Sequence, residues 1–237
     1  VRGGSIVVFA DEALQVFGQI DARGGIVAPT DPQTAGGFVE TSSFGALVIE
    51  TSPLIGAGGT WLIDPTNITI SSAATNNVGT TGANPITYTA TTSPANLSVG
   101  TVRTQLLAGV QVIVQTGNSG AEAGDITLSA DLDFDGVTTG ELVLRAHRHI
   151  VINNRIYDSG LTTPTNKLKL TLVADTAAAD AGSVSINENI DTRGGLFTSS
   201  GMNFSLASGK SISTLGGNVS LTHNGVVTLD GTMTAAG

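Results

Sequence analysis

Three aspartates at alternate positions are the strongest candidates for chemistry in this sequence. The segment DLDFDG places Asp131, Asp133 and Asp135 on one face of a predicted strand, with Leu132 and Phe134 on the other. Their carboxylates could hold a calcium ion or, if clustered, serve a carbohydrate lyase or hydrolase. The alternative is a solvated outer face that discourages lateral strand pairing. The sequence favours the solvated face and leaves calcium binding as an alternative.

Two histidines in the segment RAHRH suggest a second kind of site. His147 and His149 stand two positions apart, a spacing that could coordinate a metal. No carboxylate is near them in the sequence, and Arg145 and Arg148 would oppose a cation. His223 is alone and is expected to be structural or exposed. Because no nucleophile-elbow, phosphate-loop, dinucleotide or zinc-protease motif is present, we predict a protein that is not an enzyme and has no cofactor.

Composition excludes several classes of protein. The 237 residues include no cysteine, which rules out disulfides, zinc–thiolate sites and cysteine nucleophiles. The net charge is −9 and the ten basic residues are mostly scattered, so nucleic acid and anionic membrane surfaces are disfavoured as partners. No apolar stretch reaches the ~18 residues that a membrane span needs. The apolar share of 40% is nevertheless enough for a substantial core.

The elements that must position these side chains are short strands. Runs in which apolar and polar residues alternate recur along the whole chain, and only residues 102–109 resemble a helix. The runs resemble one another at a spacing near twenty residues, which is typical of a solenoid. We therefore predict an all-β fold, a right-handed parallel β-helix of roughly eleven coils. Side-chain amides are expected to form turns or stacked ladders at Asn153, Asn154, Asn187 and Asn189.

Nearly the same phrase, IDARGG and IDTRGG, stands at residues 20–25 and 190–195. In each copy an aspartate follows a buried isoleucine at the end of a strand, and two glycines supply a corner with positive φ. The phrase recurs because the same corner of the coil is built again. The predicted corner residues are Asp21, Gly24, Gly25, Asp191, Gly194 and Gly195.

Three regions follow from this pattern. Residues 1–72 are predicted to form the first coils and residues 101–237 to continue them. Between them, residues 73–100 are polar and contain Pro85 and Pro94, so we expect an irregular loop or a hairpin.

Two segments carry a resemblance to a known family. GGFVETS (36–42) followed by GTWLIDPTNITI (59–70) resembles the repeats of filamentous-haemagglutinin-type exoproteins, the secreted partners of bacterial two-partner secretion systems. Residues 4–25 and 120–134 are similar to other coils of that family. The resemblance implies a right-handed parallel β-helix in a long extracellular adhesin. The NPNG- and NPNL-type motifs of the family's secretion domain are missing, so the resemblance points to the stalk.

The resemblance also implies a function. We expect a secreted structural rod at the bacterial cell surface that mediates adhesion or the cohesion of a matrix or biofilm. Its implied partners are glycans or proteins on host or neighbouring cells, and an outer-membrane transporter during secretion. Nucleic acid and membrane insertion are not expected.

Two other functions stay open. One is a self-assembling filament, because the ends of a β-helix expose unpaired strand edges. The other is a carbohydrate-active enzyme, which needs a groove with converging carboxylates. A sugar-stacking role for Trp61 is a further alternative.

Overall fold

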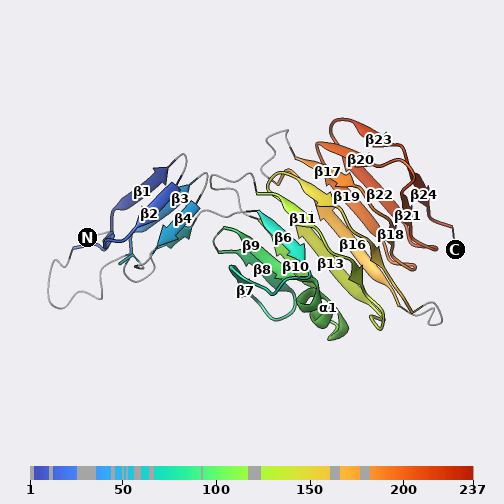
Figure 1. Cartoon of the computed structure of the whole chain (residues 1–237), viewed down its shortest axis with the longest axis horizontal. Coiled ribbons are helices and arrows are strands. Elements are labelled where there is room, and N and C mark those ends of the chain that lie inside the picture. The colour runs from blue at the N-terminus through green and yellow to red at the C-terminus, as the bar shows by residue number, and fades with distance from the viewer. Residues whose placement is uncertain are drawn as a thin grey trace. The chain divides into compact units, whose positions relative to one another are not determined.

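In the computed structural model, the regular structure of the described residues consists almost entirely of short strands (Figure 1). The described residues fall into two compact units: a smaller one within residues 3–63 and a larger one within residues 67–236. The structure describes residues 3–10, 13–25, 36–43, 46–49, 51, 53–55, 60–63, 67–91, 93–116, 124–160, 166–176 and 182–236.

The larger unit consists of three sheets. The first runs in the order β22-β19-β16-β13-β10-β8-β7, the second β23-β20-β17-β14-β11-β6-β9, and the third β12-β15-β18-β21-β24. The first contains β7 (Val78–Thr81), β8 (Ile86–Ala90), β10 (Val112–Gln115), β13 (Gly140–Arg145), β16 (Leu168–Val173), β19 (Phe197–Gly201) and β22 (Val219–His223). The second contains β6 (Ile68–Ser71), β9 (Ala95–Ser98), β11 (Ile126–Leu128), β14 (Ile150–Ile152), β17 (Ser183–Ile186), β20 (Asn203–Leu206) and β23 (Val227–Leu229). The third contains β12 (Leu132–Asp133), β15 (Ile156–Tyr157), β18 (Ile190–Asp191), β21 (Ser211–Ser213) and β24 (Thr232–Thr234).

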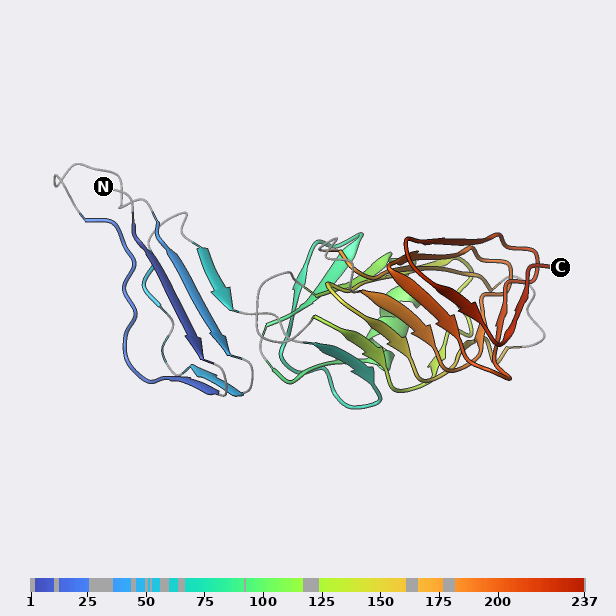
Figure 2. The same cartoon turned by 90° about the horizontal axis from the view of Figure 1, so that it is seen from above.

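From β10 onward the chain visits the three sheets in turn, and the path can be followed in Figure 2. We call each set of three successive strands, one per sheet, a round. Each strand pairs in parallel with the corresponding strands of the neighbouring rounds. Contacts between successive rounds join residues from 20 (Ser183 and Asn203) to 34 (His149 and Ser183) positions apart. The described rounds are therefore mostly longer and less regular than the predicted twenty residues.

Inward ladders of apolar side chains form the core of the larger unit. In one ladder Ile150 lies opposite Val184, which lies opposite Phe204, and all three are buried. Along β16 buried and half-buried residues alternate, because successive side chains of a strand point to opposite faces. The predicted all-β class is confirmed, since every regular element of the described residues except α1 is a strand and the sheets are mainly parallel.

Residues 73–100, predicted to be a loop or a hairpin, are largely built into the sheets. β7 and β8 form an antiparallel hairpin. However, β8 also pairs in parallel with β10, and β9 with β6, so two of these three strands continue the parallel pattern.

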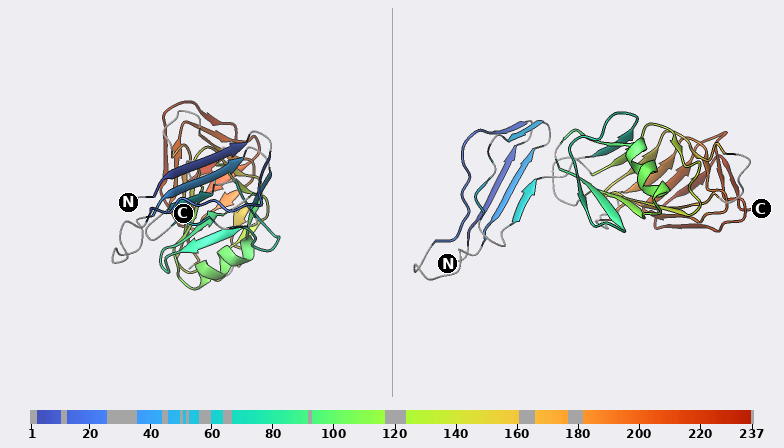
Figure 3. Two further views of the ribbon diagram at one scale, coloured as in Figure 1. Left: turned by 90° about the vertical axis from the view of Figure 1, so that its left-hand side faces the viewer. Right: turned by 90° about the horizontal axis from the view of Figure 1, so that it is seen from below.

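The one helix of the described residues, α1 (Val99–Leu107), follows β9 and packs beside β13 and β9 (Figure 3). It begins three residues earlier than predicted because the Ser98 hydroxyl caps the helix by accepting a hydrogen bond from the N–H of Gly100. Its buried residues Val102 and Leu106 join the core, and Gly109, at φ +73°, follows its end. No helix in the described ranges is long and apolar enough to cross a membrane.

The smaller unit repeats the parallel pattern with fewer strands. Asp21 forms an isolated parallel bridge with Leu54. The side chain of Trp61 lies outside the described residues, so the structure does not bear on its predicted role. One sheet contains β1 (Ser5–Ala10), β3 (Phe38–Ser43) and β5 (Thr60–Ile63), and a second contains β2 (Ala13–Val16) and β4 (Ala46–Ile49).

Candidate functional site

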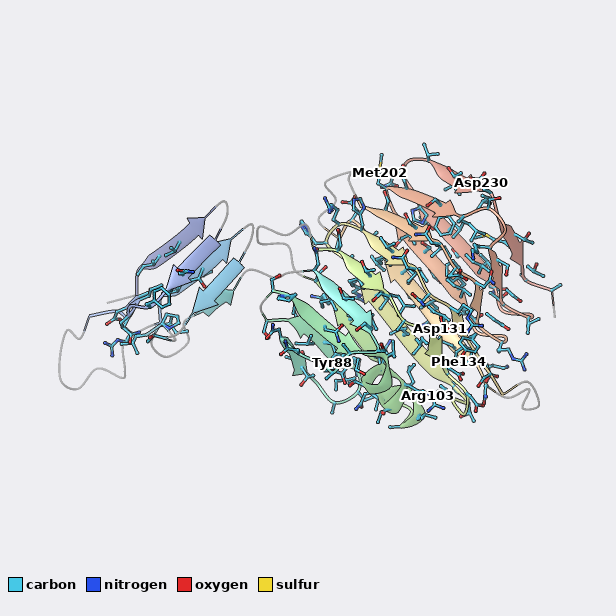
Figure 4. All side chains as sticks on the ribbon, in the orientation of Figure 1. Tyr88, Arg103, Asp131, Phe134, Met202 and Asp230 are labelled. Atoms are coloured by element: carbon cyan, nitrogen blue, oxygen red, sulfur yellow. The ribbon has the colours of Figure 1, made fainter. Side chains whose placement is uncertain are left out.

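The three aspartates of the DLDFDG segment lie on one side of the chain. Leu132 and Phe134 are buried, whereas Asp131, Asp133 and Asp135 are half-buried, as the alternating pattern predicts. The strand itself, β12, is only two residues long. The alternation of buried and half-buried residues therefore extends beyond the strand at both ends. Figure 4 labels Asp131 and Phe134 in this part of the larger unit.

Asp131 is bound by the next round. Arg155 donates to Asp131 Oδ2 from Nε at 3.0 Å and from Nη2 at 2.6 Å, and its backbone N–H donates to Oδ1 at 3.0 Å. The hydrogen bonds from Arg155 lower the pKa of the Asp131 carboxyl, and the same contact raises the pKa of Arg155. The Arg155 guanidinium also lies 4.4 Å from the centre of the Tyr157 ring. The carboxylate thus ties two rounds together.

Asp133 and Asp135 are also held by groups of the following segment. Asp133 accepts hydrogen bonds from the hydroxyl of Ser159 at 2.6 Å and from its N–H at 3.1 Å. Burial raises the pKa of Asp133, but these hydrogen bonds outweigh it, so the pKa is lowered. Asn166 Nδ2 lies 3.3 Å from Asp135 Oδ1. From α1, Arg103 donates to the carbonyls of Asp133 and Asp135 at 2.9 and 2.8 Å.

A buried ion pair lies close to this segment, and sequence reasoning missed it. Asp158 is only 4% exposed, and its Oδ2 lies 3.4 Å from Nε of Arg193 without accepting a hydrogen bond. Its other oxygen accepts from the N–H of Gly160 and from Nδ2 of Asn166. No local signal could have found the pair, because its two members come from different rounds.

The ion pairs of the larger unit all join neighbouring rounds. Its described residues form five ion pairs, including the two above, and in each pair the acid lies in an earlier round than the base. No group of three or more His, Asp or Glu residues in the described ranges is placed to hold a metal ion. The arrangement connects adjacent rounds through opposite charges. The pairs are Asp125–Arg148, Asp131–Arg155, Glu141–Lys169, Asp158–Arg193 and Glu188–Lys210.

The histidine pair lies closer to a carboxylate than the sequence suggested. His149 donates its backbone N–H to Asp125 Oδ1 at 3.0 Å, and its ring Nδ1 accepts from the N–H of Ser183 at 3.0 Å. The backbone N–H of His147 donates to the hydroxyl of Thr116. The Nδ1 atom of His149 is therefore already hydrogen-bonded to a backbone N–H of the next round.

His223, predicted to be structural or exposed, is half-buried and has a serine partner. Its Nε2 lies 3.0 Å from the hydroxyl of buried Ser199, and its ring packs against Phe204 at 5.4 Å. Its Nδ1 is buried without a hydrogen-bond partner in the described part of the chain, and burial lowers the pKa of the ring. A serine nucleophile would need its histidine oriented by a third group at this nitrogen.

The two predicted corners share their aspartate geometry. Asp21 Oδ1 accepts from the N–H of Arg23 at 3.0 Å, and Asp191 Oδ1 from the N–H of Arg193 at 2.9 Å. The Arg23 side chain also bonds Asp21 and lowers its pKa to about 2. In both copies the aspartate thus folds the chain back on itself.

The prediction that both glycines of each corner have positive φ was wrong. In the second copy Arg193 (φ +52°) and Gly194 (φ +94°) take this conformation, whereas Gly195 does not. At Gly195 a Cβ would lie 2.0 Å from the carbonyl oxygen of Leu168, so a close approach between rounds requires the glycine. In the first copy neither Gly24 nor Gly25 has a positive φ.

No family model matches the chain, and no curated protein matches it. The resemblance to the haemagglutinin-type exoproteins therefore stays a prediction. What the larger unit can do follows from its geometry: the hydrogen bonds to the three predicted carboxylates come from neighbouring main-chain and side-chain groups, largely of the next round. Such contacts fix the register of successive rounds.

Proposed function

We propose that the chain is a structural segment of a bacterial extracellular adhesin, built as a right-handed parallel β-helix. The observation that carries this proposal is the return of the chain to three parallel sheets in turn, with one inward ladder running along each sheet. A right-handed path is expected because strand–crossover–parallel strand connections are right-handed in nearly all proteins.

Several features support a mechanical role. In each ion pair of the larger unit's described residues an acid of one round binds a base of the next, so these charges stabilise the stack. Threonine and serine dominate the outward positions of the later strands, such as Thr171, Thr198 and Ser220. The resemblance of residues 36–42 and 59–70 favours secretion through an outer-membrane transporter and contacts with glycans or proteins of other cells.

An adhesion assay tests the proposal. Beads coated with the 237-residue chain are incubated with epithelial cells and with bacteria, and bound beads are counted. Beads coated with albumin and beads coated with heat-unfolded chain are the controls. We expect the folded chain to retain several times more beads than either control. Equal binding of all three kinds of bead would contradict the proposal.

A further inference from the structure

A groove crosses three successive rounds at the end of the first sheet. It has a volume of about 300 Å³, at the lower end of the ~300–1,000 Å³ of small-molecule clefts. Val173 lies opposite Ser200, which lies opposite Thr222, so one residue of each round contributes to the wall. Met202, labelled in Figure 4, follows the groove residue Gly201 and marks this part of the larger unit.

The polar side chains of this groove differ from those around Asp131 in their hydrogen bonding within the protein. The hydroxyls of Ser200 and Thr222 and the amide of Asn224 make no hydrogen bond to another group in the described parts of the chain. The carboxylates of the DLDFDG segment, by contrast, are bound by neighbouring residues. Donors and acceptors that the protein leaves open in a concave site are available to a ligand.

The shape of the groove is built into the backbone. A Cβ at Gly201, whose φ is +149°, would lie 3.0 Å from Cβ of Ala174 and 3.2 Å from the carbonyl oxygen of Gly182. A larger residue at position 201 would therefore fill the floor. Asp175 takes φ +58°, a conformation uncommon for residues other than glycine, and places a carboxylate at the rim.

We propose that this groove binds a neutral carbohydrate. Hydroxyl and amide groups together can donate to and accept from the hydroxyls of a sugar. The aliphatic side chains of Val173 and Ala174 offer an apolar surface to the C–H groups of a sugar ring. No lysine, arginine or histidine is among the described residues that line the groove, so sulfated and sialylated glycans lack a partner charge there. This ligand class rests on the proposed adhesive function and gives that function a specific contact.

The test uses the 237-residue chain labelled with ¹⁵N and titrated with galactose, glucose, mannose and N-acetylglucosamine at millimolar concentration. We expect at least one of these sugars to shift the backbone amide signals of Ser200, Gly201 and Asn224. Thr222→Val and Asn224→Ala should weaken binding tenfold or more. Thr228→Val, an exposed threonine of the same round outside the groove, should leave it unchanged. Equal thermal stability of the three variants shows that the fold is intact.

Three outcomes overturn the inference: no shift with any of the four sugars, shifts confined to residues outside the groove, or binding only of sialyllactose or a heparin disaccharide tested in parallel. The bead assay separates this failure from failure of the proposed function. If wild-type beads adhere while no sugar binds the groove, adhesion stands and the carbohydrate site is wrong. If sugars bind but beads do not adhere, the site stands and adhesion is wrong.

Discussion

Thr214 makes the same buried corner as Thr192, one round later. The hydroxyl of Thr192 donates to the carbonyl of Gly195 at 2.7 Å, and that of Thr214 donates to the carbonyl of Gly217. Both threonines are 0% exposed, and the residue after each has a positive φ. The repeated unit of this corner is thus a threonine, one non-glycine residue with positive φ, and two glycines, of which the first also has a positive φ.

Removing the Thr192 hydroxyl should destabilise the larger unit. In a Thr192→Val variant the carbonyl of Gly195 loses a buried donor, and an unsatisfied buried group costs ~1–3 kcal/mol. Urea unfolding should show this loss, whereas Thr198→Val, at a half-buried outward position, should stay within ~0.5 kcal/mol. Equal stability of the two variants would contradict the role of the hydroxyl.

Gly217 should not tolerate a side chain. A Cβ there would lie 2.1 Å from the carbonyl oxygen of Gly195, so Gly217→Ala must push two rounds apart at a cost of ~1–3 kcal/mol or more. Gly100→Ala is the matched control, because it lies in α1 with only ordinary contacts and alanine favours helix by ~0.5–1 kcal/mol. Thermal unfolding should lower the midpoint for the first variant and not for the second.

The alternating pattern predicted which side chains of a strand are buried, because alternation is a local property. It predicted the face of Asp133 correctly, and the expected amide stacking occurs where Asn187 donates to Asn153 at 2.8 Å. The second threonine corner was missed because Ser213 stands where the predicted motif has an aspartate.

Partners in different rounds could not be predicted from the sequence. The ion pairs join residues 22 positions apart at Glu188 and Lys210 but 28 apart at Glu141 and Lys169. Since the rounds differ in length, no fixed spacing relates an acid to its base, and only the register of the sheets brings them together.

Opposite charges in adjacent rounds should couple energetically. Arg148 donates to both oxygens of Asp125 at 2.9 and 2.7 Å, and the carboxylate is only 19% exposed. A double-mutant cycle of Asp125→Asn and Arg148→Gln should give a coupling of ~0.2–1 kcal/mol, toward the upper end because the pair is bidentate. A control cycle pairs Asp125→Asn with Arg145→Gln. Arg145 is an exposed arginine of the same round, so this cycle should give no coupling to Asp125.

The stabilisation that the Asp21 carboxylate gives to the corner of the smaller unit should be lost in acid. Arg23 lowers the pKa of Asp21 from 3.8 to about 2, so the folded state favours the charged carboxylate. The stabilisation is then complete above pH ~4 and is lost as the pH falls through about 2. Carboxyl NMR titration should give a pKa near 2 for Asp21 and a higher value in an Arg23→Gln variant, which loses the guanidinium but keeps the backbone hydrogen bond to Asp21. An unchanged pKa in that variant would show that Arg23 is not the cause.

His223 should make the larger unit less stable in mild acid. Burial lowers the pKa of its ring, and the buried Nδ1 would have no acceptor for a second proton. The unfolded state then binds the proton more readily than the folded state, so stability falls as the pH drops below 6.5 and levels off below the lowered pKa. In a His223→Gln variant, which retains a group able to hydrogen-bond the Ser199 hydroxyl, the decline over this interval should be smaller. Unfolding midpoints measured across the interval compare the two proteins, and NMR titration of the ring in the folded wild type measures the pKa directly. A folded-state pKa above 6.5 would refute this prediction.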